Sequence, residues 1–86
     1  MQEVKNNILE NLCYTALVYE RINKKLTVNM KKQETETFIK KIIQETDSSK
    51  FVQIGKNFYI SNEKQGIRIT VNSNTYRIIT VDKLVA

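Results

Sequence analysis

The chain has 86 residues, a net charge of +5 and no proline, which suffices for one small domain spanning residues 1–86 and not for two. It contains no histidine and a single cysteine, Cys13, so it lacks the commonest general base and transition-metal ligand and cannot form an internal disulfide. It shows neither a signal-peptide pattern nor an apolar run of about 20 residues, so we expect a cytoplasmic protein. Because it has no histidine and only one cysteine, we also expect that it binds no metal or other cofactor.

The excess positive charge lies in the second half of the chain. Residues 1–49 hold eight Lys or Arg against seven Asp or Glu, whereas residues 50–86 hold six against two. A basic half-domain favours anionic partners such as nucleic acid or acidic protein surfaces. The alternative is that the lysines only keep the protein soluble, and net charge alone does not decide between these interpretations.

The first half predicts two helices. Apolar residues recur every three or four positions over residues 3–26, which is typical of one long amphipathic helix. The members of this stripe are Val4, Ile8, Leu12, Ala16, Tyr19, Ile22 and Leu26. A second helix is predicted from about Lys32 to Thr46, where Phe38, Ile39, Ile42 and Ile43 form an apolar stripe.

Beyond Lys50 the apolar residues alternate with polar ones, which is typical of strands. A three-residue turn over residues 55–57 would pair Ile54 with Phe58 and Val52 with Ile60, with Gln53 on the opposite face. Two further strands follow, separated by turn residues. The predicted fold class is therefore α+β, with two N-terminal helices packed on one face of a four-stranded antiparallel meander sheet.

The last hairpin has an unusually polar outer face. A turn at Ser73-Asn74 predicts that Asn72 pairs with Thr75, Thr70 with Arg77, and Arg68 with Ile79. The residues expected to enter the core are Ile67, Ile69, Val71, Tyr76 and Ile78. In this register two arginines share the outer face and lie diagonally close, with no acid between them.

The candidate binding site consists of Lys56, Tyr59, Arg68, Thr70, Asn72, Thr75 and Arg77. We expect the arginines to contact phosphate or carboxylate groups, the Thr and Asn side chains to hydrogen-bond, and the tyrosine to stack. The alternative is a face that is only solvated. In that case the next surface to test is that of the first helix, with Tyr14, Glu20, Arg21 and Lys24.

Few catalytic patterns are present. There is no glycine-rich phosphate loop, and Gly55 and Gly66 are typical turn residues. Cys13 lies within the predicted apolar helix, so we expect a packed side chain and not a nucleophile. Cleavage of RNA through its 2′-OH stays open, because Arg, Lys and Tyr can supply an acid, a base and cations without histidine.

Two tracts, CYTALVYERINKKL at residues 13–26 and IRITVNSNTYRIIT at residues 67–80, resemble an uncharacterised family of small bacterial proteins. It is a domain of unknown function found in low-GC Gram-positive bacteria and their mobile elements. The similarity covers nearly the whole chain and departs around residues 30–33, where family members have a better helix cap. The resemblance implies no activity. At fold level, two helices and a meander resemble barnase, colicin and RelE-type ribonuclease toxins.

Three functions follow from these observations. The leading prediction is a small basic binding module whose exposed sheet face binds RNA or a nucleoprotein. One alternative is a toxin-like, metal-independent endoribonuclease that uses the same residues. The other is a phage or mobile-element inhibitor, similar to anti-CRISPR proteins, that acts by binding a nuclease. The sequence does not predict an oligomeric state.

Overall fold

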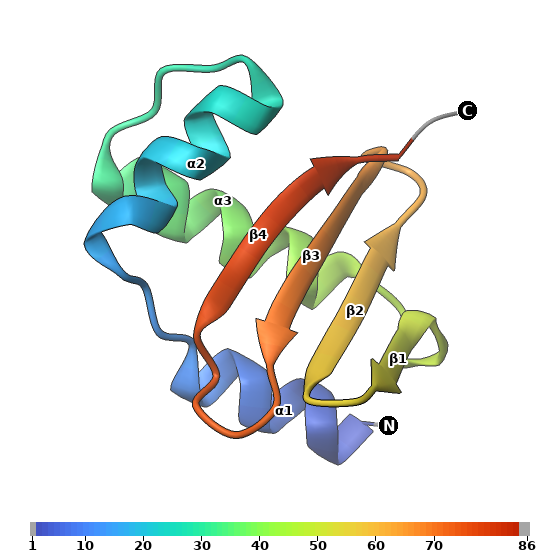
Figure 1. The fold of residues 1–86 in the computed structure, drawn as a ribbon. Coiled ribbons are helices and arrows are strands. Elements are labelled where there is room, and N and C mark those ends of the chain that lie inside the picture. The colour runs from blue at the N-terminus through green and yellow to red at the C-terminus, as the bar shows by residue number, and fades with distance from the viewer. Residues whose placement is uncertain (1, 85–86) are drawn as a thin grey trace.

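The computed structural model describes residues 2–84, and this part of the chain forms three α-helices followed by four strands. The helices are α1 (Gln2–Asn11), α2 (Ala16–Leu26) and α3 (Lys32–Glu45), and a short 3-10 helix, η1 (Ser48–Lys50), follows. The strands β1 (Phe51–Ile54), β2 (Asn57–Asn62), β3 (Ile67–Asn72) and β4 (Ile78–Lys83) form one antiparallel sheet in chain order (Figure 1). The α+β class and the meander are confirmed. Within residues 2–84, no helix has both the length and the apolar character that crossing a bilayer requires.

The prediction of one helix over residues 3–26 is wrong, because the chain leaves α1 at Asn11 and enters α2 only at Ala16. The intervening Cys13, Tyr14 and Thr15 are all weak helix formers. Thr15 takes the N-cap position of α2 with an extended backbone. The helical periodicity survives the break because both helices present their apolar side to the same core.

The segment between α1 and α2 pairs with the chain just before β4. The Cys13 N–H donates to the Tyr76 carbonyl at 2.9 Å, and the Cys13 carbonyl accepts from the Ile78 N–H at 3.0 Å. These bonds satisfy backbone groups that a continuous helix would have satisfied internally. Cys13 is exposed as a consequence, and the expectation of a packed side chain within a helix is wrong.

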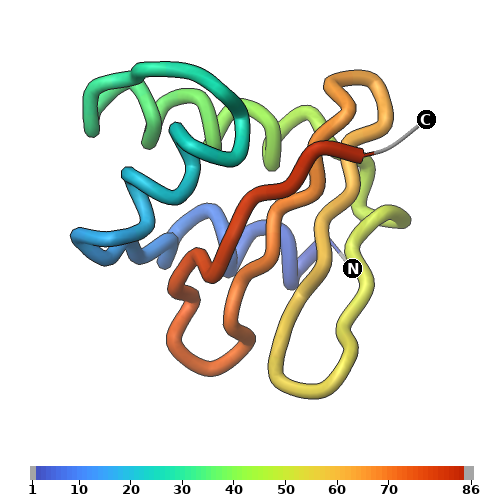
Figure 2. Tube along the Cα trace, turned by 45° about the horizontal axis from the view of Figure 1, so that its top comes forward, coloured from blue at the N-terminus to red at the C-terminus, as the bar shows by residue number. Residues whose placement is uncertain are grey.

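The core lies between the sheet and the helices. Ile60, Ile69 and Val81 pair with one another across β2, β3 and β4, and each is fully buried. In Figure 1, α1 and α3 lie behind the strands and α2 lies beside β4; Figure 2 shows the same arrangement from a second angle. Two helices therefore cover the inner face of the sheet, and the third lies along its β4 edge. Among the described residues, no helix covers the outer face.

The first hairpin differs from its prediction by one residue. Its turn holds two residues, Gly55 and Lys56, with Gly55 at a φ of +60°, which glycine adopts without strain. Val52 therefore pairs with Tyr59, and Val52 and Ile54 are 49% and 63% exposed. The prediction that Val52 and Ile54 face the core is wrong. Gln53 pairs with Phe58 and so lies on the other face from the one predicted, although it is exposed there.

The last hairpin has a longer loop and a bulge. The Tyr76 N–H donates to the Asn72 carbonyl at 2.9 Å, and Tyr76 adopts a φ of 58°. A shift of register follows, so that Val71 pairs with Ile78 but Thr70 pairs with Thr80. The predicted pairs of this hairpin are therefore wrong. The residues predicted to enter the core are placed correctly: Ile67, Ile69, Val71 and Ile78 are buried, and Tyr76 is half-buried against the core.

Candidate functional site

The centre of the outer face is an arginine over an aromatic ring. Tyr59 lies between Val52 and Thr70 in the pairing of β1, β2 and β3. The guanidinium carbon of Arg68 lies 6.0 Å from the centroid of the Tyr59 ring, within the range of a cation–π contact. Thr70 points to this face yet is only 4% exposed, so its hydroxyl offers a ligand little surface. Tyr59 and Arg68 are the part of the predicted site that the structure places together.

Arg68 faces an acid, contrary to the prediction that no acid lies near it. Arg68 pairs with Asp82 of β4 in the sheet. Asp82 also forms a salt bridge with Lys25 of α2, in which Nζ and Oδ1 lie 3.0 Å apart. Asp82 therefore has two cationic neighbours, and the local balance stays positive.

Arg77 lies away from Arg68. It precedes β4 and forms an isolated β-bridge with Cys13 through the backbone. It also lines a hollow of about 250 Å³ between α2 and β4. The second arginine of this hollow is Arg21, whose Nη1 donates to the Ile79 carbonyl at 3.0 Å. The prediction that Arg68 and Arg77 lie diagonally close is therefore wrong. Arg77 shares its hollow with an arginine from α2.

Asn72, Thr75 and Lys56 belong to the turns at one end of the sheet. The Asn72 Oδ1 accepts from the Asn74 N–H at 2.8 Å and from the Thr75 N–H at 2.9 Å, so this side chain stabilises the loop. The Lys56 carbonyl accepts from the N–H and the hydroxyl of Ser73, at 2.7 and 2.9 Å, and ties the two turns together. Thr75 and the side chain of Lys56 are exposed, beyond the Arg68 and Tyr59 pair.

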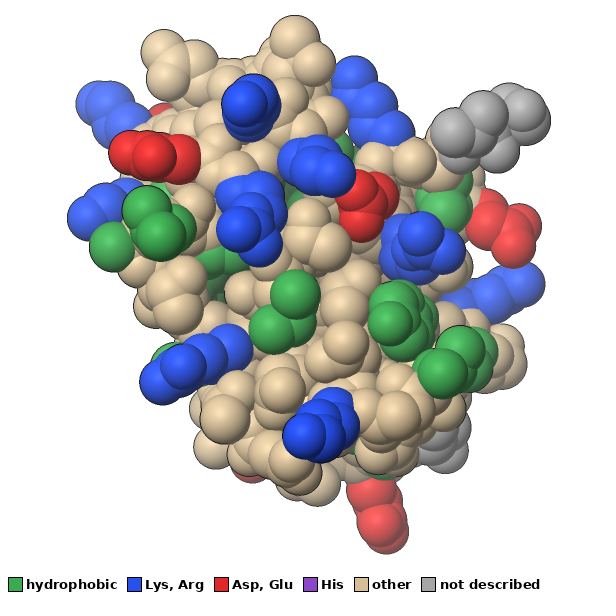
Figure 3. Space-filling model, in the orientation of Figure 1, with side chains coloured by type: hydrophobic (Ala, Val, Ile, Leu, Met, Phe, Trp, Pro, Cys, Tyr) green, Lys and Arg blue, Asp and Glu red, His purple; other side chains and the backbone are tan. Residues whose placement is uncertain are grey.

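A row of cations on α2 widens the surface beyond the sheet. Arg21, Lys24 and Lys25 are exposed, and α2 lies beside β4. Figure 3, drawn from the same side as Figure 1, shows Lys and Arg side chains gathered over the α2 and β4 half of this face, with hydrophobic side chains across its middle. The sequence carried this signal as cations three and four residues apart, which share one side of a helix. What it did not show was that α2 lies next to β4.

A separate aromatic cluster lies between α2 and α3. The rings of Tyr14 and Tyr19 stack at 5.5 Å, and the Tyr19 hydroxyl donates to Glu36 Oε2 at 2.7 Å. Burial, and then the charges of Glu36 and Tyr19, raise the pKa of Tyr14 well above its ordinary value. Burial and the bond to Glu36 raise the pKa of Tyr19 to about 12. Both phenols therefore stay protonated at neutral pH, and neither is an activated base.

A family model described as a protein of unknown function (DUF3781) matches residues 6–82. Neither the curated proteins nor the solved structures gave a match. Within residues 2–84, no three His, Cys, Asp or Glu side chains gather where they could hold a metal ion.

Proposed function

The chain belongs to the DUF3781 family of proteins of unknown function, and we propose that it is a binding module for single-stranded RNA. The proposed ligand lies across the outer face of the sheet and along α2. Bases contact the Tyr59 and Arg68 pair, and phosphates contact the cations of α2 and Arg77. We further propose that the protein acts as one domain in the cytoplasm of a low-GC Gram-positive bacterium or on one of its mobile elements.

The observation that carries this proposal is the contact between Arg68 and Tyr59. Tyr59 sits on β2, with pairing strands on both sides, so the ring has a rigid base. An aromatic ring on a sheet is a stacking platform for any base, and a base stacked on it gains roughly 1–3 kcal/mol. An arginine over the same ring adds a planar, permanently charged donor for phosphate.

The second support is the position of the cations relative to this platform. Lys25 reaches Asp82 on β4, and Arg21 reaches the Ile79 carbonyl on the same strand, so the α2 cations border the sheet face. Arg77 joins Arg21 at the end of β4 where the strand begins. A strand of RNA that stacks on Tyr59 can thus place successive phosphates along one basic border, which is the arrangement that gives salt-dependent binding.

The test is a fluorescence titration of a labelled single-stranded RNA of about 12 nucleotides. We compare the unchanged protein with Arg21→Gln/Arg77→Gln, at about 50 mM and about 200 mM salt. We expect the variant to bind at least tenfold more weakly, about 1.4 kcal/mol. Its salt dependence should also flatten, by about 0.7 in the logarithmic slope for each phosphate contact that is lost.

The matched control is Lys40→Gln/Lys41→Gln, which removes the same charge from exposed positions of α3, behind the sheet. We expect this variant to bind as the unchanged protein does. Equal weakening in both variants would show that only net charge matters, and would contradict the proposed site. Unchanged binding in both would contradict it as well.

The same experiment separates the alternative functions. Cleavage of the RNA during the titration would select the endoribonuclease, with Arg68, Arg77, Tyr59 and Lys56 as the residues to test. Absence of any RNA binding would select a protein partner, a nucleoprotein or a nuclease, for this face. Each outcome is visible on one gel run beside the titration.

A further inference from the structure

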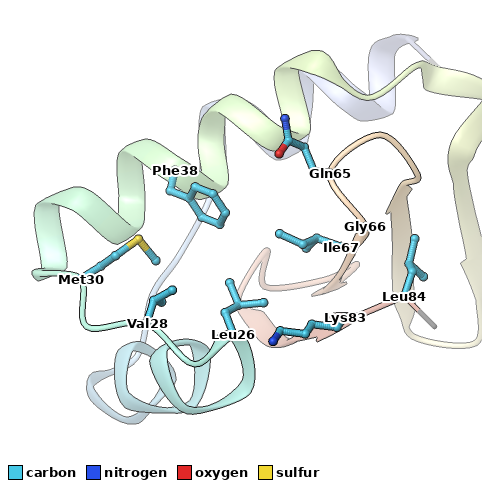
Figure 4. Close-up of a pocket in the computed structure, with 9 residues that line it drawn as sticks. All are labelled: Leu26, Val28, Met30, Phe38, Gln65, Gly66, Ile67, Lys83 and Leu84. Carbon is cyan, nitrogen blue, oxygen red and sulfur yellow. The ribbon is translucent and has the colours of Figure 1, made fainter. Parts of the chain in front are cut away.

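An apolar pocket of about 310 Å³ opens at the end of the sheet where β3 begins and β4 ends. It lies between α3, the connection from α2 to α3, and the adjoining ends of these strands (Figure 4). Ile67, one of its lining residues, faces the core side of the sheet, so the pocket is separate from the outer face. Its size is at the lower end of the range for small-molecule sites, roughly 300–1,000 Å³.

The walls of the pocket are hydrocarbon. Figure 4 shows Leu26, Val28, Met30, Phe38 and Ile67 pointing toward one another across a common space. Leu26 and Ile67 are 8% and 7% exposed and form its floor, whereas Val28 is 44% exposed at its mouth. An apolar ligand that enters here removes its own surface and that of Val28 from water, which is the main source of affinity for such sites.

Hydrogen bonds fix the chain on two sides of the pocket. The Asn23 side chain donates to the Met30 carbonyl and accepts from the Met30 N–H, both at 3.0 Å, and so fixes the connection from α2 to α3. On the opposite wall, the Leu84 N–H donates to the Gly66 carbonyl at 2.8 Å. A pre-formed pocket binds more tightly than one that must be ordered by its ligand.

The polar groups of the pocket favour an anion. Lys83 and Gln65 are its two side chains with hydrogen-bond donors, and no acid is among the described residues that line it. In Figure 4 the Lys83 amine reaches along one side of the pocket toward Leu26 and Val28. An ammonium beside an apolar cavity recognises a negatively charged group at the end of a hydrocarbon body.

We infer that this pocket binds a free, unbranched monocarboxylate of medium chain length. Its hydrocarbon chain fills the space between Phe38, Met30 and Ile67, and its carboxylate pairs with Lys83 at the mouth. A volume of about 310 Å³ lies at the lower end of the range for small-molecule sites and suits one slender chain. Decanoate is therefore the probe of choice. The inference does not rest on RNA binding, and each can fail without the other.

The test is a nuclear magnetic resonance titration of the ¹⁵N-labelled full chain with decanoate below its micelle concentration. We expect saturable shifts of the amide signals of Val28, Met30, Phe38 and Ile67. Lys83→Gln should weaken binding at least fivefold, and Val28→Trp, which fills the mouth, should abolish it. Decanol, which has the same chain without the charge, should bind at least fivefold more weakly than decanoate.

The control is Lys64→Gln, which removes the same charge from the neighbouring turn without touching the pocket. We expect it to bind decanoate as the unchanged protein does. The inference is overturned if decanoate causes no saturable shifts, if decanol binds as well as decanoate, or if Lys64→Gln weakens binding as much as Lys83→Gln. It is also overturned if Val28→Trp, folded by its amide spectrum, still binds decanoate.

Discussion

The two faces of the same sheet differ in what fixes their residues. On the inner face, Ile60, Ile69 and Val81 are fully buried against the helices. On the outer face, Tyr59 and Arg68 contact each other and solvent. The inner residues must fit the space left between the sheet and the helices, whereas the outer residues are limited by which groups they contact. Both kinds alternate along the same strands. Stability and the proposed RNA binding therefore depend on opposite faces, and substitutions can address them one at a time.

The sharpest test of this contrast compares two neighbours on β3. Ile69→Ala leaves a cavity at the centre of the inner face and should lower the free energy of unfolding by about 3 kcal/mol. Thr70→Ala on the outer face should lower it by about 1 kcal/mol. Urea unfolding followed by circular dichroism measures both. Equal losses would show that the outer face is as tightly packed as the core.

Asn62 offers a second test of the contrast between the two faces, because it is a polar residue that is buried with the core. Its Nδ2 donates to Thr46 Oγ1 at 3.0 Å, and its Oδ1 accepts from the Gln65 N–H at 2.9 Å. Asn62→Ala removes both bonds and the buried amide that makes them, although the Thr46 hydroxyl keeps its bond to the Ile42 carbonyl, and should cost about 2 kcal/mol of unfolding free energy. The exposed Asn74→Ala is the control. A loss below about 0.5 kcal/mol for Asn62→Ala would mean that the bonds contribute little.

The inner face was largely predictable from the sequence. Periodicity alone placed Ile67, Ile69 and Val71 inward, because burial tolerates no polar residue at those positions. It could not place Val52, because a turn of two or three residues after Ile54 is equally compatible with the local pattern. That one-residue choice turned Val52 to the opposite face.

The candidate site was less predictable, for reasons that lie outside local sequence. The Asn72 N–H donates to the Arg77 carbonyl, so the loop of the last hairpin is longer than two residues, and the position of Arg77 could not be counted from a turn at Ser73-Asn74. Its neighbour Arg21 comes from a helix that begins at Ala16, just after Cys13 pairs with the strand region. Both effects are tertiary. A sequence pattern shows which residues alternate, but it does not show which distant segment pairs with them through backbone hydrogen bonds.

Tyr59 should matter for RNA binding more than for stability. Tyr59→Thr replaces one residue that favours strands with another, β-branched one, and removes the stacking surface. We expect about tenfold weaker binding of single-stranded RNA and a loss of unfolding free energy below about 1 kcal/mol. Val52→Thr, at the paired position on β1, is the control and should leave RNA binding unchanged. A folded Tyr59→Thr protein with full affinity would exclude stacking on this ring.

The smallest expected effect concerns the acid of the outer face, Asp82. It neutralises part of the charge of Lys25 and Arg68, and it would repel a phosphate that approaches either. Asp82→Asn keeps the shape and removes the charge, so RNA affinity should rise about threefold at low salt, and less at high salt because ions screen the repulsion. The lost salt bridge is exposed to solvent and should cost about 0.5 kcal/mol of unfolding free energy or less. The titration described for the arginine variants measures the gain. A fall in affinity would reveal the opposite role: Asp82 would then hold Lys25 and Arg68 in the positions that bind RNA, and the acid would be part of the site.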